Sequence, residues 1–221
     1  MRNIIKYFWL FIFGSFFGFI VETLWCLIKN KKIESRKGLI YGPFTPVYGI
    51  AAVFITLLIE LFKTKSYFGV FLITFIISFL VEYLSSICQE KCFGTKSWDY
   101  SKMPLNINGR VNLFYVLAFS IIGLIWLEIY PTFLKLIQQI LISTSIYYLI
   151  SIIFGVFMIY NIIISILASY RQKLRRSNIQ PKNKFEIWLD KKYTDEYLKK
   201  VYANAVFVDN NLVVNNPLKM K

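Results

Sequence analysis

Histidine is absent from the 221-residue sequence. Imidazole is the side chain that most readily exchanges a proton near neutral pH and is a common zinc ligand, so its absence excludes histidine-based catalysis and most ordinary zinc sites. The three cysteines cannot form a disulfide framework without leaving one thiol unpaired. The sequence also has no Gly-x-x-x-x-Gly-Lys-Ser/Thr segment, the usual phosphate-binding loop. We therefore expect a protein that is not an enzyme and holds no metal or cofactor.

Charged residues are scarce, at 17% of the chain against about 25% in soluble domains, whereas apolar residues reach 57%. Mean hydropathy is +0.53. A transmembrane helix needs about 20 mainly apolar residues, and the first such run is too long for the core of a signal peptide. The sequence predicts an all-α, polytopic integral membrane bundle of about five transmembrane helices, at residues 7–28, 46–62, 67–87, 111–129 and 140–169.

Basic residues outnumber acidic ones by 26 to 12, and their distribution predicts an orientation. Lys and Arg accumulate in the connections that stay in the cytoplasm. With the N-terminus outside, 21 of the 26 basic residues fall on the inner side. We expect a multi-pass cell-membrane protein with a bundle at 1–169 and a basic cytoplasmic tail at 170–221. This tail would carry an amphipathic helix at about 183–203 and contact anionic lipids, and nucleic acid is not an expected partner.

Part of the first predicted helix recurs in the third. Residues 19–24 read Phe-Ile-Val-Glu-Thr-Leu, and residues 79–84 read Phe-Leu-Val-Glu-Tyr-Leu. This pattern favours a parallel repeat of two helix pairs, the first with the second and the third with the fourth. Transporters commonly place a site at the interface of such repeats. The alternative is that two apolar segments share six similar letters through composition alone.

Glu22 and Glu82 are carboxylates within predicted membrane spans, where an unpaired charge costs a few kcal/mol. Gly14 and Gly18 precede Glu22 at intervals of four, as in a helix-packing stripe. The same interval surrounds Glu82, with Thr74, Ser78 and Ser86. Both carboxylates should therefore face the bundle interior. They would bind a proton, cation or substrate, or alternatively cap a loop or pair with Arg110.

Two connections between the predicted helices have unusual composition. Residues 38–49 mix apolar side chains with Gly and Pro, which predicts a re-entrant or interfacial turn, or alternatively an ordinary tight loop. Residues 98–110 contain further candidate binding residues: Asp99, Asn106, Asn108 and Arg110. The Asn residues suit turns, and Arg110 could pair with Asp99, Glu82 or a lipid phosphate. A structural latch between Asp99 and Arg110 is favoured over a catalytic pair.

These segments together resemble the bacterial CmpB-like family. The resemblance comprises an acidic residue in the first helix, the 38–49 run, Val81-Glu82-Tyr83, and the 98–110 run. It extends from about Trp9 to Pro131. It implies a type IV ABC-transporter permease that moves a solute while a separate chain supplies the ATPase.

Three functions fit these observations to different degrees. The first is an ABC-transporter permease-like component that moves a small solute or ion, in a homo-oligomer or a larger complex because five helices enclose only a thin pathway. The second is a non-transporting scaffold or regulatory subunit, in which Glu22, Glu82, Asp99 and Arg110 form a structural network. The third, a lipid-modifying enzyme, has little support because the sequence lacks an obvious reactive group.

Overall fold

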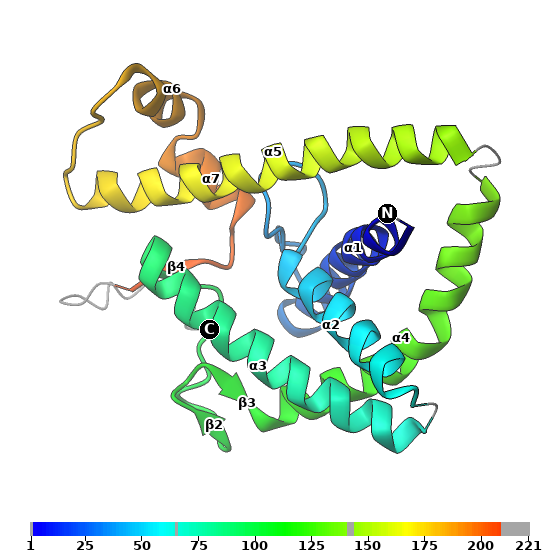
Figure 1. Ribbon diagram of the computed structural model, residues 1–221. Helices are drawn as coiled ribbons and strands as arrows, with labels where there is room; N and C mark the ends of the chain where they lie inside the picture. The colour runs from blue at the N-terminus through cyan, green and yellow to red at the C-terminus, as the bar shows by residue number, and fades with distance from the viewer. Residues whose placement is uncertain (1, 65, 141–143, 209–221) are drawn as a thin grey trace.

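The computed structural model describes residues 2–64, 66–140 and 144–208 (Figure 1). Within these ranges the chain is mainly helical. The helices are α1 (Arg2–Asn30), α2 (Pro46–Phe62), α3 (Tyr67–Phe93), α4 (Leu113–Ile140), α5 (Thr144–Arg176), α6 (Lys184–Lys192) and α7 (Asp195–Val201). The strands are two residues each: β1 (Thr95–Lys96), β2 (Asn106–Ile107), β3 (Val111–Asn112) and β4 (Val206–Phe207).

Four of these helices, α1, α3, α4 and α5, are long and apolar enough to cross a membrane. Helix α2 is equally apolar but has 17 residues, which corresponds to about 26 Å at 1.5 Å per residue. This length is at the lower limit for a span. The all-α membrane bundle predicted from composition is confirmed, and the count of five depends on α2.

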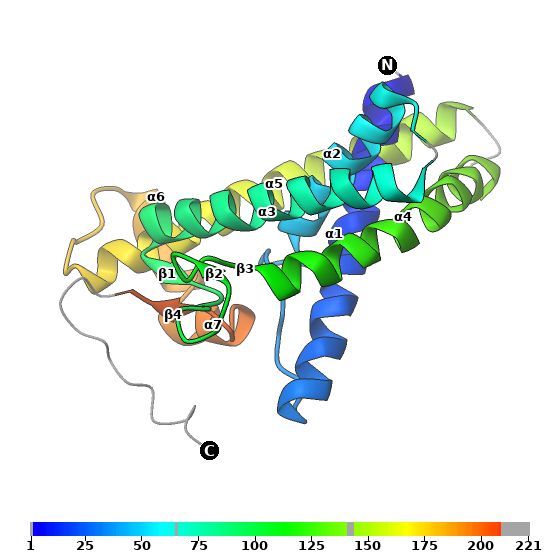
Figure 2. The same ribbon diagram turned by 90° about the horizontal axis from the view of Figure 1, so that it is seen from below.

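The α1–α2 pair lies between α5 on one side and the α3–α4 pair on the other (Figure 1). Helix α1 crosses α3 and α5 steeply rather than running parallel to them (Figure 2). The largest buried cluster joins the first four helices and includes Leu10, Ile55, Val70, Ile77 and Trp126. Trp9 connects α1 to α5 by donating a hydrogen bond from Nε1 to Ser151 Oγ, at 2.9 Å.

Small residues allow α1 and α2 to approach closely, as the spacing of Gly14 and Gly18 predicts. A Cβ atom on Gly14 would lie 2.6 Å from Ala52 Cβ, and one on Gly18 would lie 2.2 Å from Tyr48 Cγ. Both distances are far below van der Waals contact. The Tyr48 ring therefore occupies the space that a side chain at position 18 would need.

Substitution of Gly18 by Val should separate α1 from α2. We expect a loss of about 1–3 kcal/mol in the free energy of unfolding, the usual cost of overpacking. Unfolding in mixed micelles measures this loss. Gly155→Val in α5 is the matched control, because an added Cβ there meets no atom within 4 Å. Equal losses in the two variants would show that helix propensity, not packing, sets the cost.

Equivalent hydrogen bonds join the helices of each predicted repeat. Tyr7 at the start of α1 donates to Glu60 Oε2 near the end of α2, at 2.9 Å. Tyr67 at the start of α3 donates to Glu128 Oε1 in α4, at 3.2 Å. The two tyrosines are 60 residues apart, the same offset as the repeated Glu motif. Each pair is thus an antiparallel hairpin closed by the same kind of bond.

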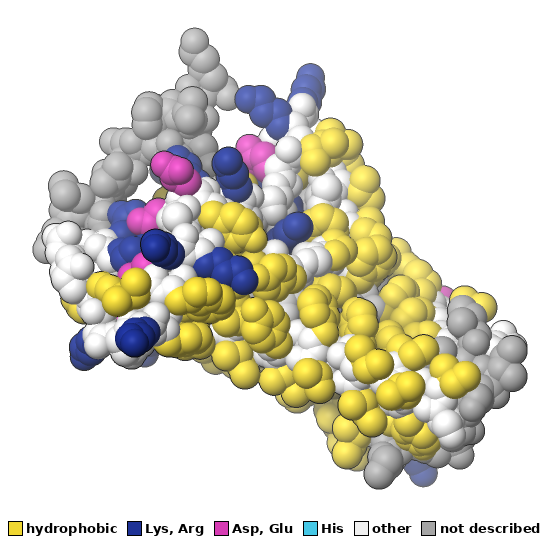
Figure 3. Space-filling model, turned by 90° about the horizontal axis from the view of Figure 1, so that it is seen from above, with side chains coloured by type: hydrophobic (Ala, Val, Ile, Leu, Met, Phe, Trp, Pro, Cys, Tyr) yellow, Lys and Arg dark blue, Asp and Glu magenta, His cyan; other side chains and the backbone are white. Residues whose placement is uncertain are grey.

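The basic connections lie together at one end of the molecule. Strand β1 after α3 pairs antiparallel with β4 after α7, in the register Thr95 with Phe207. Ser35 in the connection before α2 donates to the Val201 carbonyl at the end of α7. On the face drawn in Figure 3, the Lys and Arg side chains gather mainly at this end, and hydrophobic side chains cover much of the rest of that face.

The tail differs from the single amphipathic helix expected at 183–203. It forms α6 and α7, which are separated because Thr194 caps α7 by accepting a hydrogen bond from the Tyr197 amide. The basic cluster at the end of α5 also differs from expectation. Arg171 pairs with Asp190 at 2.6 Å and with Glu186 at 3.3 Å, and Arg175 pairs with Asp190 and Asp195. These arginines hold α6 and α7 against α5 instead of facing lipid.

Candidate functional site

Glu22 is held by a tyrosine from the first turn of α2. That helix starts at Pro46, whose fixed backbone angle suits a first helical position. Two residues later, Tyr48 stacks over Gly18 and donates a hydrogen bond from its hydroxyl to Glu22 Oε1, at 2.6 Å. The Glu22 side chain is half-buried. Tyr48 therefore packs against Gly18 and bonds Glu22 with the same side chain.

Glu82 has a similar partner from the connection after α3. The Tyr100 hydroxyl interacts with the Glu82 carboxylate, and Glu82 is 7% exposed. Burial raises the pKa of Tyr100 far above its usual value, and the carboxylates of Glu82 and Glu22 raise it further. Both carboxylates thus lie close enough to interact with the same phenol. Glu82 Oε2 is buried without a hydrogen-bond partner in the described part of the chain.

Aromatic rings adjoin the two tyrosines. Tyr48 meets Phe119 edge to face, with ring centroids 5.7 Å apart. Tyr100 stacks on Tyr115 at 5.0 Å, and Tyr115 meets Trp25 edge to face at 6.0 Å. These rings come from all of the first four helices except α3, together with the connection after α3. The carboxylates of α1 and α3 consequently lie near the same group of rings and hydroxyl groups.

Arg110 does not pair with any of the protein carboxylates predicted for it. It donates from Nη1 to Ser86 Oγ at 3.1 Å and pairs through Nη2 with Glu90 at 2.6 Å. Asp99 instead accepts a hydrogen bond from the Ser101 amide at 2.9 Å. The expected latch between Asp99 and Arg110 is therefore wrong: Asp99 caps its own turn, and Glu90, one helical turn beyond Ser86, reaches Arg110 first.

The surroundings of Asp99 are consistent with a charged capping group. Burial would raise its pKa, but hydrogen bonds from the Ser101 backbone and side chain, with the charges of Lys96 and Lys102, lower it overall. Asp99 thus stays ionised at neutral pH at the edge of the connection.

A double-mutant cycle distinguishes the two possible partners of Arg110. Arg110→Gln and Glu90→Gln should couple by about 1 kcal/mol, since both side chains are partly open to water, at 19% and 27% exposed. Arg110→Gln and Asp99→Asn should be additive. The free energy of unfolding is the quantity compared. A coupling to Asp99 as large as that to Glu90 would contradict the structure.

Asn106 and Asn108 serve the turn that joins β2 to β3. Asn106 accepts from the Gly109 amide at 2.9 Å and donates to the Met103 carbonyl at 2.6 Å. Asn108 has a φ of 53°, which Asn tolerates better than most residues, and it donates to the Tyr83 hydroxyl at 3.1 Å. Neither amide has a contact in this structure with Glu22 or Glu82, so the two asparagines and the carboxylates form separate groups.

The connection before α2 is an irregular segment packed against α5. The amide of Tyr41 donates to Asn161 Oδ1 at 3.0 Å, and Asn161 Nδ2 donates to the Tyr41 carbonyl at 2.7 Å. The Ile40 amide donates to Ser165 Oγ at 2.9 Å. Because lipid offers no hydrogen bonds, irregular backbone at membrane depth requires such partners. Asn161 is fully buried and satisfies both main-chain groups of one residue.

Several of these partners were not predicted from the sequence. Tyr48 and Tyr100 lie within the two recognised motifs, and their hydroxyl groups are the chemical signal that could have indicated a carboxylate partner. Asn161 is a strongly polar residue of its helix, but nothing in the sequence indicates which backbone it bonds. Glu90 was not among the partners predicted for Arg110, and no group of three or more His, Cys, Asp or Glu side chains that could hold a metal ion exists among the described residues.

Fold and site together define a polytopic helical membrane protein in which two helix hairpins bring a pair of carboxylates together. The chain matches the family described as "Putative ABC-transporter type IV" over residues 9–166, and it belongs to that family. The match confirms the resemblance seen in the motifs and extends it into α5. No curated protein and no solved structure matches the chain.

Proposed function

We propose that this protein is the permease-like component of an ABC-type transport system and moves a small solute or ion, while another chain supplies the ATPase. The observation that carries the proposal is the meeting of Glu22 and Glu82, one from each hairpin, beside Tyr48 and Tyr100. Membership of the family supports it. Because the path between these helices is narrow, the protein acts as a homo-oligomer or within a larger complex.

The energetics favour a functional reason for these carboxylates. An acidic group within a membrane span costs a few kcal/mol unless it is paired, protonated or hydrated. Hydrogen bonds from tyrosine hydroxyl groups offset part of that free-energy cost and leave the negative charge in place. Neither Glu22 nor Glu82 has a basic partner within the described ranges, so the pair keeps its capacity for a proton or cation.

Transport in reconstituted vesicles tests this function. The purified chain, alone and with an ATPase encoded beside it, is placed in phosphatidylethanolamine–phosphatidylglycerol vesicles, and uptake of protons and of radiolabelled methylammonium is followed. We expect flux that Glu82→Gln reduces strongly and Glu128→Gln leaves unchanged, since Glu128 bonds Tyr67 away from the paired carboxylates. The absence of flux for both probes in both preparations would refute the transport function.

A non-transporting scaffold is the second candidate. It is favoured by the many polar contacts that fix the connections, such as Asn161 with Tyr41 and Arg110 with Glu90. A scaffold requires Glu22→Gln and Glu82→Gln to lower the free energy of unfolding while any flux stays unchanged. A loss of flux at unchanged stability therefore decides against it.

We infer that the N-terminus is outside, that α2 spans the membrane, and that residues 170–221 form the cytoplasmic tail. The gathering of the basic connections at one end supports this orientation (Figure 3). Cys88 and Cys92 are exposed at that end. They should react with a membrane-impermeant maleimide only after cells are permeabilised. A cysteine introduced as Lys63→Cys, in a variant lacking both, should react in intact cells, and the opposite pattern would reverse the topology.

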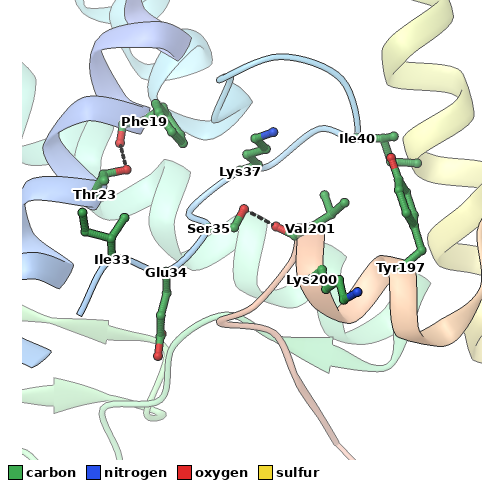
Figure 4. A pocket seen from close by; sticks show the side chains of 10 residues that line it. All are labelled: Phe19, Thr23, Ile33, Glu34, Ser35, Lys37, Ile40, Tyr197, Lys200 and Val201. Atoms are coloured by element: carbon green, nitrogen blue, oxygen red, sulfur yellow. Dashed lines mark hydrogen bonds between the residues drawn. The ribbon is translucent and has the colours of Figure 1, made fainter.

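Anionic lipid is a further proposed partner at the inner face. Because Arg171 and Arg175 are engaged by the tail, we place the contact at a pocket of about 380 Å³ between α1, the connection before α2, and α7. Lys37 and Lys200 line this pocket together with Phe19 (Figure 4). Lys37→Gln with Lys200→Gln should reduce binding to phosphatidylglycerol vesicles in a flotation assay. Unchanged flotation would remove the pocket from consideration.

A further inference from the structure

The paired carboxylates are bordered by aromatic rings to an extent that the proposed transport function does not itself require. Tyr48 contacts Phe119, and Tyr100 contacts Tyr115, which also contacts Trp25. An aromatic ring presents a negative face, so rings beside carboxylates add to the attraction for a positive charge. The rings and the carboxylates therefore both favour a positively charged ligand.

Among the described residues, neither Glu22 nor Glu82 forms an ion pair with a basic side chain. Of the basic residues in α3 and the connection after it, Arg110 bonds Ser86 and Glu90, and Lys96 also pairs with Glu90. Glu82 is more than nine-tenths buried, and its Oε2 has no hydrogen-bond partner in the described residues. A buried carboxylate oxygen without a donor is an acceptor position that a ligand can use.

We propose that Glu22, Glu82 and the surrounding rings bind an organic ammonium ion, a protonated alkylamine or its methylated form. The proposal rests on the proposed function only for the statement that this ligand is also the transported solute. The free Glu82 oxygen accepts an N–H of the ammonium group, or lies against its methyl groups. The Phe119 ring and the Tyr115 ring, one face of which stacks on Tyr100, lie against the positive charge, while Tyr48 and Tyr100 orient the carboxylates.

The donor set suits an organic cation better than a divalent metal ion. Ca²⁺ takes six to eight oxygen ligands and Mg²⁺ about six, whereas this site offers two carboxylates and two phenol hydroxyls that interact with them. An organic ammonium ion needs fewer oxygen ligands than these metal ions and can also be stabilised by aromatic rings. A cation over an aromatic face gains about 2 kcal/mol when both are removed from water. Aromatic rings would add little to the binding of a strongly hydrated metal.

Equilibrium binding to the purified full-length protein in detergent tests the proposal, with methylammonium and tetramethylammonium chloride as probes and sodium chloride as the reference salt. Isothermal titration calorimetry should show saturable binding of the ammonium salts. Glu82→Gln should weaken it about 10- to 100-fold, the usual effect of losing a charged hydrogen-bond partner. Glu128→Gln, which removes a carboxylate at the other end of α4, should leave the affinity unchanged.

A pair of substitutions at Tyr115 separates a ring contact from a structural role. Tyr115→Phe keeps the ring and should bind tetramethylammonium nearly as well as the unsubstituted protein. Tyr115→Leu keeps an apolar side chain but removes the ring, and it should weaken binding about 5- to 30-fold. These variants remain informative even where Glu82→Gln lowers stability, because thermal unfolding of both is compared beforehand.

The outcomes separate this inference from the transport function. Absence of saturable ammonium binding, or equal binding by Tyr115→Leu and Tyr115→Phe, overturns the inference. A pH-dependent change in tryptophan fluorescence that Glu82→Gln abolishes, without ammonium binding, also overturns it in favour of a proton site. Ammonium binding without flux of any probe in vesicles would refute transport and leave the binding site intact. Proton flux without ammonium binding would support transport and refute the ammonium-binding site.

Discussion

Replacing Asp190 by Asn should release α6 and α7 from the end of α5. Asp190 accepts hydrogen bonds from Arg171 and Arg175, and the Arg171 side chain is only 4% exposed. Removing one partner of a buried ion pair typically costs about 3–5 kcal/mol because the other charge stays buried. We expect about 2–3 kcal/mol here, since Glu186 still reaches Arg171 and Arg175 is partly exposed.

Amide hydrogen exchange across residues 184–201 measures this release. Exchange in Asp190→Asn should be at least tenfold faster than in the unsubstituted protein, while Glu196→Gln, at an exposed position of α7, should leave it unchanged. Unaltered exchange in Asp190→Asn would mean that apolar contacts such as those of Leu189 and Leu198 hold the tail alone.

Acid should produce the same release in the unsubstituted protein. Burial would raise the pKa of Asp190, but hydrogen bonds and charges from Arg171 and Arg175 lower it overall. A lowered folded-state pKa means that the carboxylate contributes stability at every pH above its unfolded value of about 4, and that this contribution is lost as the pH falls through the folded-state value. The exchange rate of Asp190→Asn should respond less to the same acidification.

Replacing Asn161 by Leu should weaken the attachment of the connection before α2 to α5. Leu fills a similar volume but leaves the amide and carbonyl of Tyr41 without partners, since Asn161 bonds both. Each unsatisfied buried group costs about 1–3 kcal/mol, so we expect a loss of about 2–5 kcal/mol in the free energy of unfolding. Ser165→Ala, which removes one acceptor from the Ile40 amide, should lose about 1–2 kcal/mol.

The control for this substitution is Ile163→Leu, at an exposed position of the same helix, which should leave stability unchanged. Unfolding in mixed micelles compares the variants. An Asn161→Leu variant as stable as this control would show that water or detergent satisfies the Tyr41 groups, and that the connection lies outside the apolar region. The graded losses of Asn161→Leu and Ser165→Ala together test whether the irregular segment is held by side chains of α5.

The bundle and its paired carboxylates could be predicted because both leave local signals. Long apolar runs indicate membrane spans directly. Spacing by four residues indicates that Glu22 and Glu82 each lie on the helix face that carries small residues. The partners of these residues could not be predicted in the same way. Arg110 had several carboxylates within reach along the chain, and the choice of Glu90 depends on how α3 ends and how the connection folds over it. Such choices are made by tertiary geometry.

The tail shows the same limit in a different form. The apolar spacing over 183–203 indicated one helix, yet α6 ends at Lys192 and Thr194 caps the start of α7. The basic residues at the end of α5 bind acidic partners that lie 15 to 20 positions further along the chain, a separation that no local sequence pattern indicates. The pattern of charges along the sequence indicates which segments lie near the membrane surface. It does not indicate which of these charges will pair with another element of the fold.

The matching bonds of Tyr7 with Glu60 and of Tyr67 with Glu128 bear on how such a chain could have arisen. Two hairpins closed by the same contact are what duplication and fusion of one ancestral hairpin gene would produce. A hairpin returns to the side on which it begins, so its duplication preserves that side. Helix α5 has no counterpart in this scheme. In the proposed topology it is the unpaired crossing, and it carries the tail to the opposite side of the bilayer from the start of α1.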